Sequence, residues 1–186
     1  MEQRAVFLDR DGVINVNRQA YVKSWEEFRF LSGVFEPLRR LARTDFSIVV
    51  VSNQSAIGRG LVRRTTVEEI NQRMVAEISA EGGRIDAVYY CPHRPEDGCD
   101  CRKPRPGMLL RAALDLSIDL SASYFIGDAV SDVEAGFAAG CRPILVLTGR
   151  GDSQHVLLAQ GKSETVAVVR DLADAVAMLL DSAREG

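Results

Sequence analysis

Residues 7–15 read Phe-Leu-Asp-Arg-Asp-Gly-Val-Ile-Asn and continue an apolar run that begins at Ala5. The run predicts a buried strand, and two aspartates, Asp9 and Asp11, stand at its end. Aspartate followed by glycine is common in turns, so Asp9, Asp11 and Gly12 alone would not indicate a catalytic site. Three further motifs follow along the chain: Ser52-Asn53-Gln54, Arg102-Lys103-Pro104, and Gly127-Asp128 with Asp132.

Short apolar runs alternate with stretches of helical spacing along the chain. Runs that are apolar throughout are typical of parallel strands buried on both faces, with amphipathic helices covering them. We therefore predict an α/β fold, a Rossmann-like three-layer sandwich with a central parallel sheet. The expected strands cover residues 5–8, 46–51, 87–90, 124–126, 144–147 and 166–169, and the expected helices 34–42, 66–80, 107–116, 132–139 and 171–183.

This fold predicts where the motifs meet. Open parallel sheets bind ligands outside the carboxyl ends of their strands, beside the point where the strand order reverses. Asp9, Ser52, Cys91 and Asp128 each follow the end of an expected strand, so we place them on one rim of a single domain, residues 1–186. The irregular segments 15–30 and 91–106 are too short for a large cap domain, so loops alone should cover the site.

The composition excludes several classes of partner. A formal net charge of −3 gives no general attraction to nucleic acid or to an anionic membrane. No apolar run approaches the roughly 20 residues that span a bilayer, and the chain enters a strand directly after Met-Glu-Gln-Arg, without a signal-peptide core. We expect a cytoplasmic protein with a small-molecule substrate, no nucleic-acid or membrane partner and a monomeric state.

The motif aspartates suit reaction with a phosphate ester. A carboxylate can attack phosphorus and form an aspartyl phosphate, and Asp9 is placed for that role. Carboxylate and phosphate repel each other, so the site needs a divalent cation; Mg²⁺ suits oxygen ligands, and Asp9 and Asp128 would supply them. Asp132 either reaches this metal or caps the following helix. Taken one by one, the motifs also fit a turn, a helix cap or a solvated loop.

Three of the four cysteines lie within eleven residues, together with one of the two histidines. In a reducing compartment such a cluster favours a metal site over disulfides. Four protein ligands would complete a tetrahedral structural zinc site and leave no position open for catalysis. Incidental thiols and a nucleic-acid-binding zinc ribbon are the alternatives, although such ribbons usually carry two CxxC pairs and a basic surface. The expected ligands are Cys91, His93, Cys99 and Cys101, and the zinc-stabilised loop would carry Arg102 and Lys103.

Five segments carry a resemblance to a known family: DRDGVIN at 9–15, SNQSAIGRG at 52–60, CPH at 91–93, CDCRKP at 99–104 and GDAVSD at 127–132. Together they closely resemble the D-glycero-D-manno-heptose-1,7-bisphosphate 7-phosphatases, which belong to the haloacid dehalogenase superfamily. The resemblance covers nearly the whole chain. It implies Mg²⁺-dependent removal of the 7-phosphate from a sugar bisphosphate, which leaves heptose 1-phosphate for nucleotide-activated heptose synthesis.

The resemblance also implies roles for individual residues. The backbone carbonyl of Asp11 is a further Mg²⁺ ligand, and its side chain protonates the leaving oxygen and later activates water. Lys103 holds the phosphate and Ser52 donates a hydrogen bond to it. The 1-phosphate requires a second anion site, for which Arg102 is the leading candidate and Arg59 a further one. The sugar is expected between Ser52, Asn53, Gln54 and Ser55 on one side and the loop from Asn17 to Tyr21 on the other.

Two positions in these loops depart from the family pattern. Ala20 precedes Tyr21 where the family usually carries glycine, and Ala56 also replaces a common glycine. Neither position belongs to the catalytic set, but both bear on the sugar contacts and on the preference between anomers.

Three other functions compete with this interpretation. A histidinol-phosphate phosphatase would share the zinc loop, but its substrate carries one phosphate and needs no second anion site. A nucleic-acid 3′-phosphatase would share the first motif, but the negative net charge and the lack of a basic stripe count against it. A metal-stabilised binding module would lack the nucleophile or the acid, whereas this sequence has both aspartates.

Overall fold

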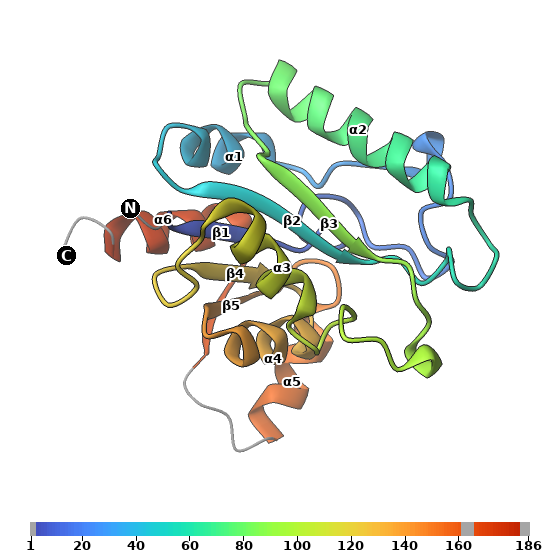
Figure 1. The fold of residues 1–186 in the computed structure, drawn as a ribbon. Coiled ribbons are helices and arrows are strands. Elements are labelled where there is room, and N and C mark those ends of the chain that lie inside the picture. The colour runs from blue at the N-terminus through green and yellow to red at the C-terminus, as the bar shows by residue number, and fades with distance from the viewer. Residues whose placement is uncertain (1–2, 161–165, 183–186) are drawn as a thin grey trace.

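A parallel sheet of six strands runs through the centre of the molecule (Figure 1). The computed structural model describes residues 3–160 and 166–182. The chain runs outward from β1 to β3 on one side of the sheet and from β4 to β6 on the other, so the strand order reverses between β1 and β4. The strands are β1 (Ala5–Leu8), β2 (Ser47–Asn53), β3 (Ala87–Cys91), β4 (Tyr124–Gly127), β5 (Arg142–Val146) and β6 (Ala167–Val169), in the spatial order β3-β2-β1-β4-β5-β6.

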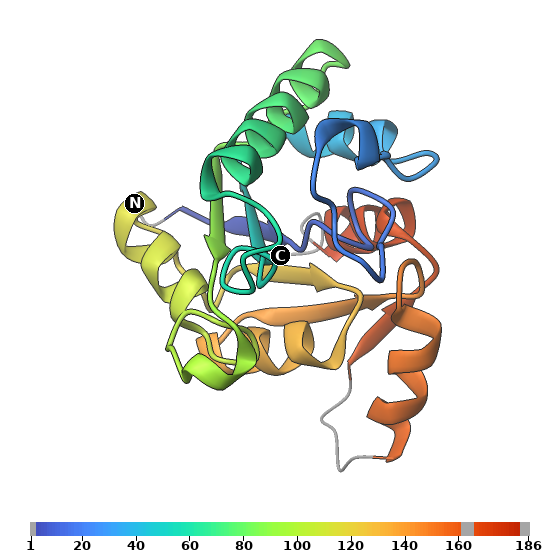
Figure 2. The same ribbon diagram turned by 90° about the vertical axis from the view of Figure 1, so that its right-hand side faces the viewer.

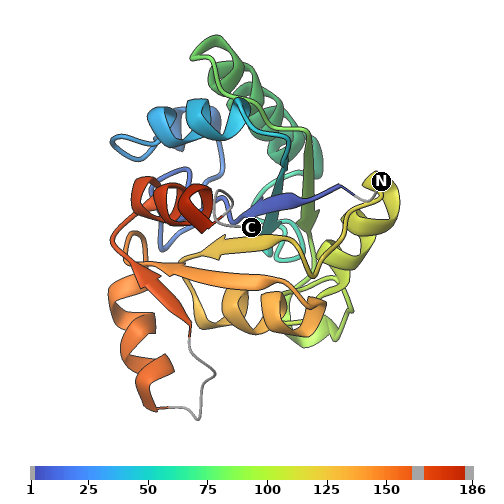
Figure 3. The ribbon, with the colours of Figure 1, turned by 90° about the vertical axis from the view of Figure 1, so that its left-hand side faces the viewer.

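Helices cover both faces of this sheet (Figures 2 and 3). The first face carries α1 (Phe35–Ala42), α2 (Arg64–Ala80) and α6 (Leu172–Ser182), and the second carries α3 (Gly107–Leu116) and α4 (Val130–Ala139). α5 (Gly151–Gln160) packs beside α4 and β5. Short 3-10 helices, Trp25–Glu27 and Pro95–Asp97, lie in the loops after β1 and β3. The described chain therefore forms three layers.

Alternate residues of the strands face two separate cores. Val6 and Leu8 of β1 join the cluster beneath α1, α2 and α6, whereas Ala5 and Phe7 join the cluster beneath α3 and α4. All four side chains are fully buried. Full burial of a large apolar side chain contributes about 1.5–3 kcal/mol, so both faces of β1 select apolar residues and the strand reads as a continuous run.

The predicted fold class is confirmed, and all six strands lie near their predicted bounds. The sequence does not predict α5, because its Val156 and Leu157 stay 55 % and 52 % exposed and no apolar face marks the helix. The predicted end of the last helix at residue 183 lies outside the described residues. Within the described ranges, loops and short helices follow the strand ends, with no inserted cap domain, and no helix has the length and apolar character needed to cross a membrane.

Candidate active site

A cavity of about 660 Å³ opens at the carboxyl ends of the strands. It collects the loops that follow β1, β2, β3 and β5 and the first turn of α4, as expected for a sheet whose order reverses between β1 and β4. The predicted catalytic and substrate-binding residues all line it: Asp9, Asp11, Asn17, Tyr21, Ser52, Asn53, Gln54, Ser55, Arg102 and Lys103. Arg18, Gln19, Val22, Ser131, Asp132, Gly149 and Arg150 complete its wall.

At the base of the cavity one lysine joins two carboxylates. The Lys103 ammonium lies 2.9 Å from Asp9 Oδ1 and 2.7 Å from Asp132 Oδ1, and it donates to the Val51 carbonyl at 3.0 Å. All three charged side chains are buried. Burial would lower the pKa of Lys103, but the neighbouring Asp132 and Asp9 raise it above its ordinary value. The lysine therefore stays protonated and offers a fixed positive charge beside Asp9.

Asp9 and Asp128 flank the reversal in strand order, one after β1 and the other after β4. Burial raises the pKa of Asp9 to about 6; Lys103 opposes the rise, and the Asp132 and Asp11 charges add to it. Burial and the nearby Asp9 charge also raise the pKa of Asp128. Asp9, Asp128 and Asp132 offer oxygen atoms within 4.8 Å of one another. This concentration of buried negative charge calls for a positive partner beyond Lys103.

The carboxylates fit a divalent cation. The buried Asp128 Oδ1 accepts no hydrogen bond from the described residues, and Arg150 Nη2 lies 3.6 Å away. The other Asp128 oxygen, Oδ2, accepts hydrogen bonds from the Arg150 backbone N–H at 2.8 Å and from Asn17 Nδ2 at 3.5 Å. Asp132 is less available to a metal ion, because its Oδ2 accepts hydrogen bonds from the backbone N–H groups of Asp128 and Ala129 at the start of α4. A cation would satisfy the orphaned Asp128 oxygen.

Two glycines let the loops after β1 and β5 approach Asp128. Gly12 has a φ of +94°, and a methyl group at this position would overlap the Asp128 carboxylate. A methyl group at Gly149, where φ is +61°, would overlap the same carboxylate and Gly12 itself. At these two positions the backbone therefore packs directly against the Asp128 carboxylate.

Asp11 accepts hydrogen bonds on both carboxylate oxygens. Arg10 Nη2 lies 3.2 and 3.0 Å from the two oxygens, Asn15 Nδ2 lies 2.9 Å from Oδ1, and Gln54 Nε2 lies 2.8 Å from Oδ2. Burial would raise the pKa of Asp11, but the Arg10 charge and these hydrogen bonds bring it below its usual range. Gln54 Nε2 also donates to Ser52 Oγ at 2.8 Å. The Asp11 carboxylate is therefore ionised and linked to Ser52 through one amide.

Asn53 binds the segment that carries Lys103. Its Nδ2 donates to the Lys103 carbonyl, and its Oδ1 accepts from the Lys103 backbone N–H, each at 3.1 Å. These two bonds tie the loop after β3 to the end of β2. Both polar groups of the Asn53 side chain are thus used within the protein, although the residue lines the cavity.

The outer wall of the cavity combines an aromatic hydroxyl with positive charges. Tyr21 has a φ of +63°, uncommon for a residue with a side chain, and its hydroxyl lies 3.4 Å from Ser55 Oγ. The Ser55 hydroxyl and the nearby Arg59 and Arg102 charges hold the pKa of Tyr21 below its ordinary value. Arg102 lines the cavity, whereas Arg59 pairs with Glu96 at 3.7 Å. This wall offers groups that bind anions.

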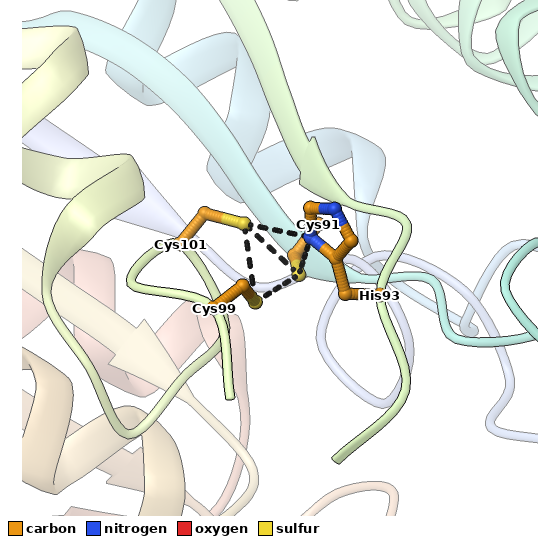
Figure 4. Close-up of side chains that lie close together, drawn as sticks. All are labelled: Cys91, His93, Cys99 and Cys101. Carbon is orange, nitrogen blue, oxygen red and sulfur yellow. Dashed lines mark hydrogen bonds between the residues drawn. The ribbon is translucent and has the colours of Figure 1, made fainter. Parts of the chain in front are cut away.

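The predicted zinc ligands form a cluster in which the side chains point toward one another (Figure 4). Cys91 ends β3, and five distances among its Sγ, the Sγ atoms of Cys99 and Cys101 and the His93 Nδ1 run from 3.2 to 3.6 Å. Ligand atoms around a tetrahedral zinc with bonds of about 2.3 Å lie roughly 3.7 Å apart, so the cluster approaches that geometry. Arg102 Nη1 donates to the His93 carbonyl at 3.3 Å, which connects the cluster to the cavity wall.

The structure brings three further residues to the site, for which the sequence predicts no role. Arg10 stands between the two motif aspartates and is 1 % exposed. Asn71 lies on the buried face of α2 with Val67 and Met74. The only sequence feature that marks it is a polar residue at a helix position where the spacing predicts an apolar one. Arg150 lines the cavity and follows β5, where the sequence carries no recognisable motif.

Comparisons with known proteins agree with this geometry. Residues 100–175 match a family model described as HAD-hydrolase-like. Over 170 residues the chain is 40 % identical to a D-glycero-beta-D-manno-heptose-1,7-bisphosphate 7-phosphatase of Pseudomonas putida, covering 91 % of this chain and 95 % of that protein. A protein of the same name from Bordetella bronchiseptica is 39 % identical over 180 residues, with 97 % and 99 % covered. The crystal structure of D,D-heptose 1,7-bisphosphate phosphatase from B. bronchiseptica, complexed with magnesium and phosphate, matches with a TM-score of 0.89 and 40 % identity, over 96 % of this chain and 99 % of that one.

Proposed function

The chain belongs to the D-glycero-beta-D-manno-heptose-1,7-bisphosphate 7-phosphatase family, and from this premise we propose that it removes the 7-phosphate and leaves heptose 1-phosphate. The observation that carries the proposal is the buried contact of Lys103 with Asp9 and Asp132, directly beside Asp128, at the base of an open cavity. The bottom of this cavity therefore combines a nucleophile, a phosphate-binding cation and a metal site, which are the parts that phosphate-ester hydrolysis requires.

In the first half of the reaction, an Asp9 carboxylate oxygen attacks phosphorus, and the bond between phosphorus and the sugar C7 oxygen breaks. Asp11, carrying the proton that it took from water in the preceding turnover, donates it to the departing oxygen, so the sugar leaves as an alcohol and Asp11 becomes ionised. Lys103 and the Ser52 hydroxyl bind the phosphoryl oxygens and offset their charge. The 2.9 Å contact between Lys103 and Asp9, and the Gln54 amide that joins Ser52 to Asp11, support these roles.

In the second half, water attacks the phosphorus of the aspartyl phosphate. Asp11 accepts a proton from this water, and the bond between phosphorus and the Asp9 oxygen breaks. Inorganic phosphate leaves, and the Asp9 carboxylate is regenerated. The hydrogen-bond donors around Asp11 favour its ionised form, which is the form that accepts the proton.

We propose that Asp9, Asp128 and the backbone carbonyl of Asp11 hold Mg²⁺. When bound, the ion offsets the repulsion between these carboxylates and the phosphate dianion. The orphaned Asp128 oxygen supports the assignment, as does the magnesium in the similar B. bronchiseptica structure. Asp132 then serves as the anchor of Lys103 and the cap of α4, since both of its oxygens contact those groups.

The four ligands Cys91, His93, Cys99 and Cys101 are proposed to hold a structural zinc ion, with no position open for substrate. None of the four cysteines forms a disulfide, which accords with a reducing compartment, and we propose the cytoplasm. A net charge of −3 supports a small-molecule partner rather than nucleic acid or membrane. We propose that residues 1–186 act as one domain and as a monomer.

The 1-phosphate needs an anion site away from the carboxylates, and we propose Arg102 for it, with Asn17, Tyr21 and Ser55 around the sugar. Changing Arg102 to alanine should raise the KM for the bisphosphate by about 10- to 100-fold, because the variant loses the binding free energy of a hydrogen bond between charged groups. The kcat should change little. Turnover of p-nitrophenyl phosphate, which has no second phosphate, should be nearly unchanged. Steady-state kinetics with both substrates measure this.

The matched control is Arg94→Ala in the same loop, because Arg94 pairs with Asp97 at 2.9 Å and is exposed. That variant should leave both substrates unaffected. An equal loss of activity on the bisphosphate and on p-nitrophenyl phosphate in Arg102→Ala would contradict the second anion site.

The function itself is tested by phosphate release with Mg²⁺ from the α and β anomers of D-glycero-D-manno-heptose 1,7-bisphosphate. Histidinol phosphate and a 3′-phosphorylated oligonucleotide are assayed as alternative substrates. We expect the highest kcat/KM on one heptose anomer, which would also identify the anomer used. A higher kcat/KM on either alternative substrate would keep the Asp9 chemistry but overturn the assigned substrate.

A further inference from the structure

The mechanism above does not use Arg10, the buried arginine between the two motif aspartates. Its guanidinium is held from three sides. Nη1 donates to the Asn71 side-chain oxygen of α2 at 3.0 Å, Nη2 lies 3.0 and 3.2 Å from the Asp11 oxygens, and Cζ lies 5.9 Å from the Phe28 ring centroid. Arg10 is 1 % exposed and does not line the cavity.

Burial of a guanidinium destabilises the folded state unless the group is paired, and an apolar side chain of similar volume often gives equal or higher stability. The fork of Arg10 does something that an apolar residue cannot do. It connects an asparagine on α2 to the carboxylate that faces the cavity, and the rigid planar group fixes the distance between them. This geometry indicates a role in orienting Asp11.

The Asp11 side chain needs such support because it is 23 % exposed at the cavity. Asn15 and Gln54 donate to it as neutral amides, and Arg10 is its charged partner. All three groups donate to an ionised carboxylate, but only Arg10 adds the attraction of a full positive charge and contacts both oxygens, so Arg10 should contribute most to the orientation of the carboxylate. Asn71, 6 % exposed, holds Arg10 in turn.

We propose that Arg10, held by Asn71, is the positioning residue that fixes the Asp11 carboxylate for proton transfer. The inference rests on the proposed phosphatase function. Arg10 and Asn71 lie behind Asp11 rather than on the cavity wall, so they affect the proton-transfer steps and not the binding of substrate. Their loss therefore lowers kcat and leaves KM nearly unchanged.

The test uses Asn71 first, because it touches neither substrate nor the reacting atoms. In Asn71→Leu, which is similar in size, Arg10 loses its acceptor; in Asn71→Asp the acceptor is kept. We expect kcat to fall by about 10- to 100-fold in Asn71→Leu, the effect of a displacement of about 1 Å in a reacting group, with KM within about twofold. Asn71→Asp should recover most of kcat. Gln72→Leu, the exposed neighbour on α2, is the matched control and should behave as wild type.

Each variant is assayed on the heptose bisphosphate and on p-nitrophenyl phosphate, and its thermal midpoint is measured. A fall in kcat that Asn71→Asp does not recover, or a rise in KM with kcat unchanged, overturns the proposal. If Asn71→Leu does not fold, Arg10→Lys decides, because it keeps the charge but not the fork; it should lose kcat and keep KM. Wild-type turnover of p-nitrophenyl phosphate without turnover of the heptose bisphosphate would remove the assigned substrate and leave this test intact.

Discussion

Replacement of Asp9 by asparagine should reduce phosphate release by roughly 10⁴-fold or more, because a carboxamide cannot act as the nucleophile toward phosphorus. The fold should persist. Lys103 keeps its 2.7 Å contact with Asp132 and its hydrogen bond to the Val51 carbonyl, so the ammonium stays partnered. Burial of Asp9 raises its pKa, which means that the charged form is disfavoured, and its neutral replacement should not lower the thermal midpoint.

The measurement is kcat with saturating Mg²⁺, together with the thermal midpoint and the zinc content of the same sample. Asp45→Asn is the matched control, since this exposed aspartate pairs with Arg4 on the surface and should keep full activity. Substantial turnover by Asp9→Asn, with the fold intact, would remove Asp9 from the nucleophile role and leave a direct attack by water as the mechanism.

Changing Cys99 to serine should release the zinc ion and lower the thermal midpoint by roughly 10 °C, because a structural zinc site contributes folding free energy directly. The effect should spread to activity. Cys101 is followed directly by Arg102 and Lys103, so a loop that is no longer held by metal presents both cations poorly. Zinc per chain, thermal midpoint and kcat/KM are the three measurements.

Cys141→Ala is the control for this experiment, because Cys141 is buried on the same side of the sheet but lies outside the cluster. It should keep its zinc. A Cys99→Ser protein that has no zinc, yet retains the wild-type midpoint and activity, would show that the metal does not organise the loop.

The strands and the rim were predictable because both depend on patterns that are local in sequence. Each buried strand is a short apolar run, and a parallel sheet necessarily brings the carboxyl ends of its strands to one edge. Asp9, Ser52 and Asp128 therefore meet without any knowledge of the helices. α5 could not be predicted in the same way, because Val156 and Leu157 remain exposed and the helix follows no amphipathic pattern.

The supporting contacts of the site could not be predicted, because each joins residues that are remote in sequence. Asn53 is predicted next to Ser52 as a substrate-binding residue, and the sequence gives no sign that its amide also binds the backbone of Lys103. Asn71 contacts Arg10 only after α2 has packed on the sheet. Register and helix packing decide these partners, and no spacing in the sequence records them.

The position of β1 in the middle of the sheet governs how the chain can be made. Ala5–Leu8 leaves the ribosome before the other five strands, and β2 can pair with one edge of it early, but the other edge stays unpaired until Tyr124–Gly127 is made. At typical rates of synthesis that interval is on the order of ten seconds. During it an apolar strand edge stays unpaired and Asp9 has no Asp128 beside it. The growing chain is therefore open to aggregation in this period, and Asp9 and Asp128, the proposed magnesium ligands, come together only when the fourth strand docks.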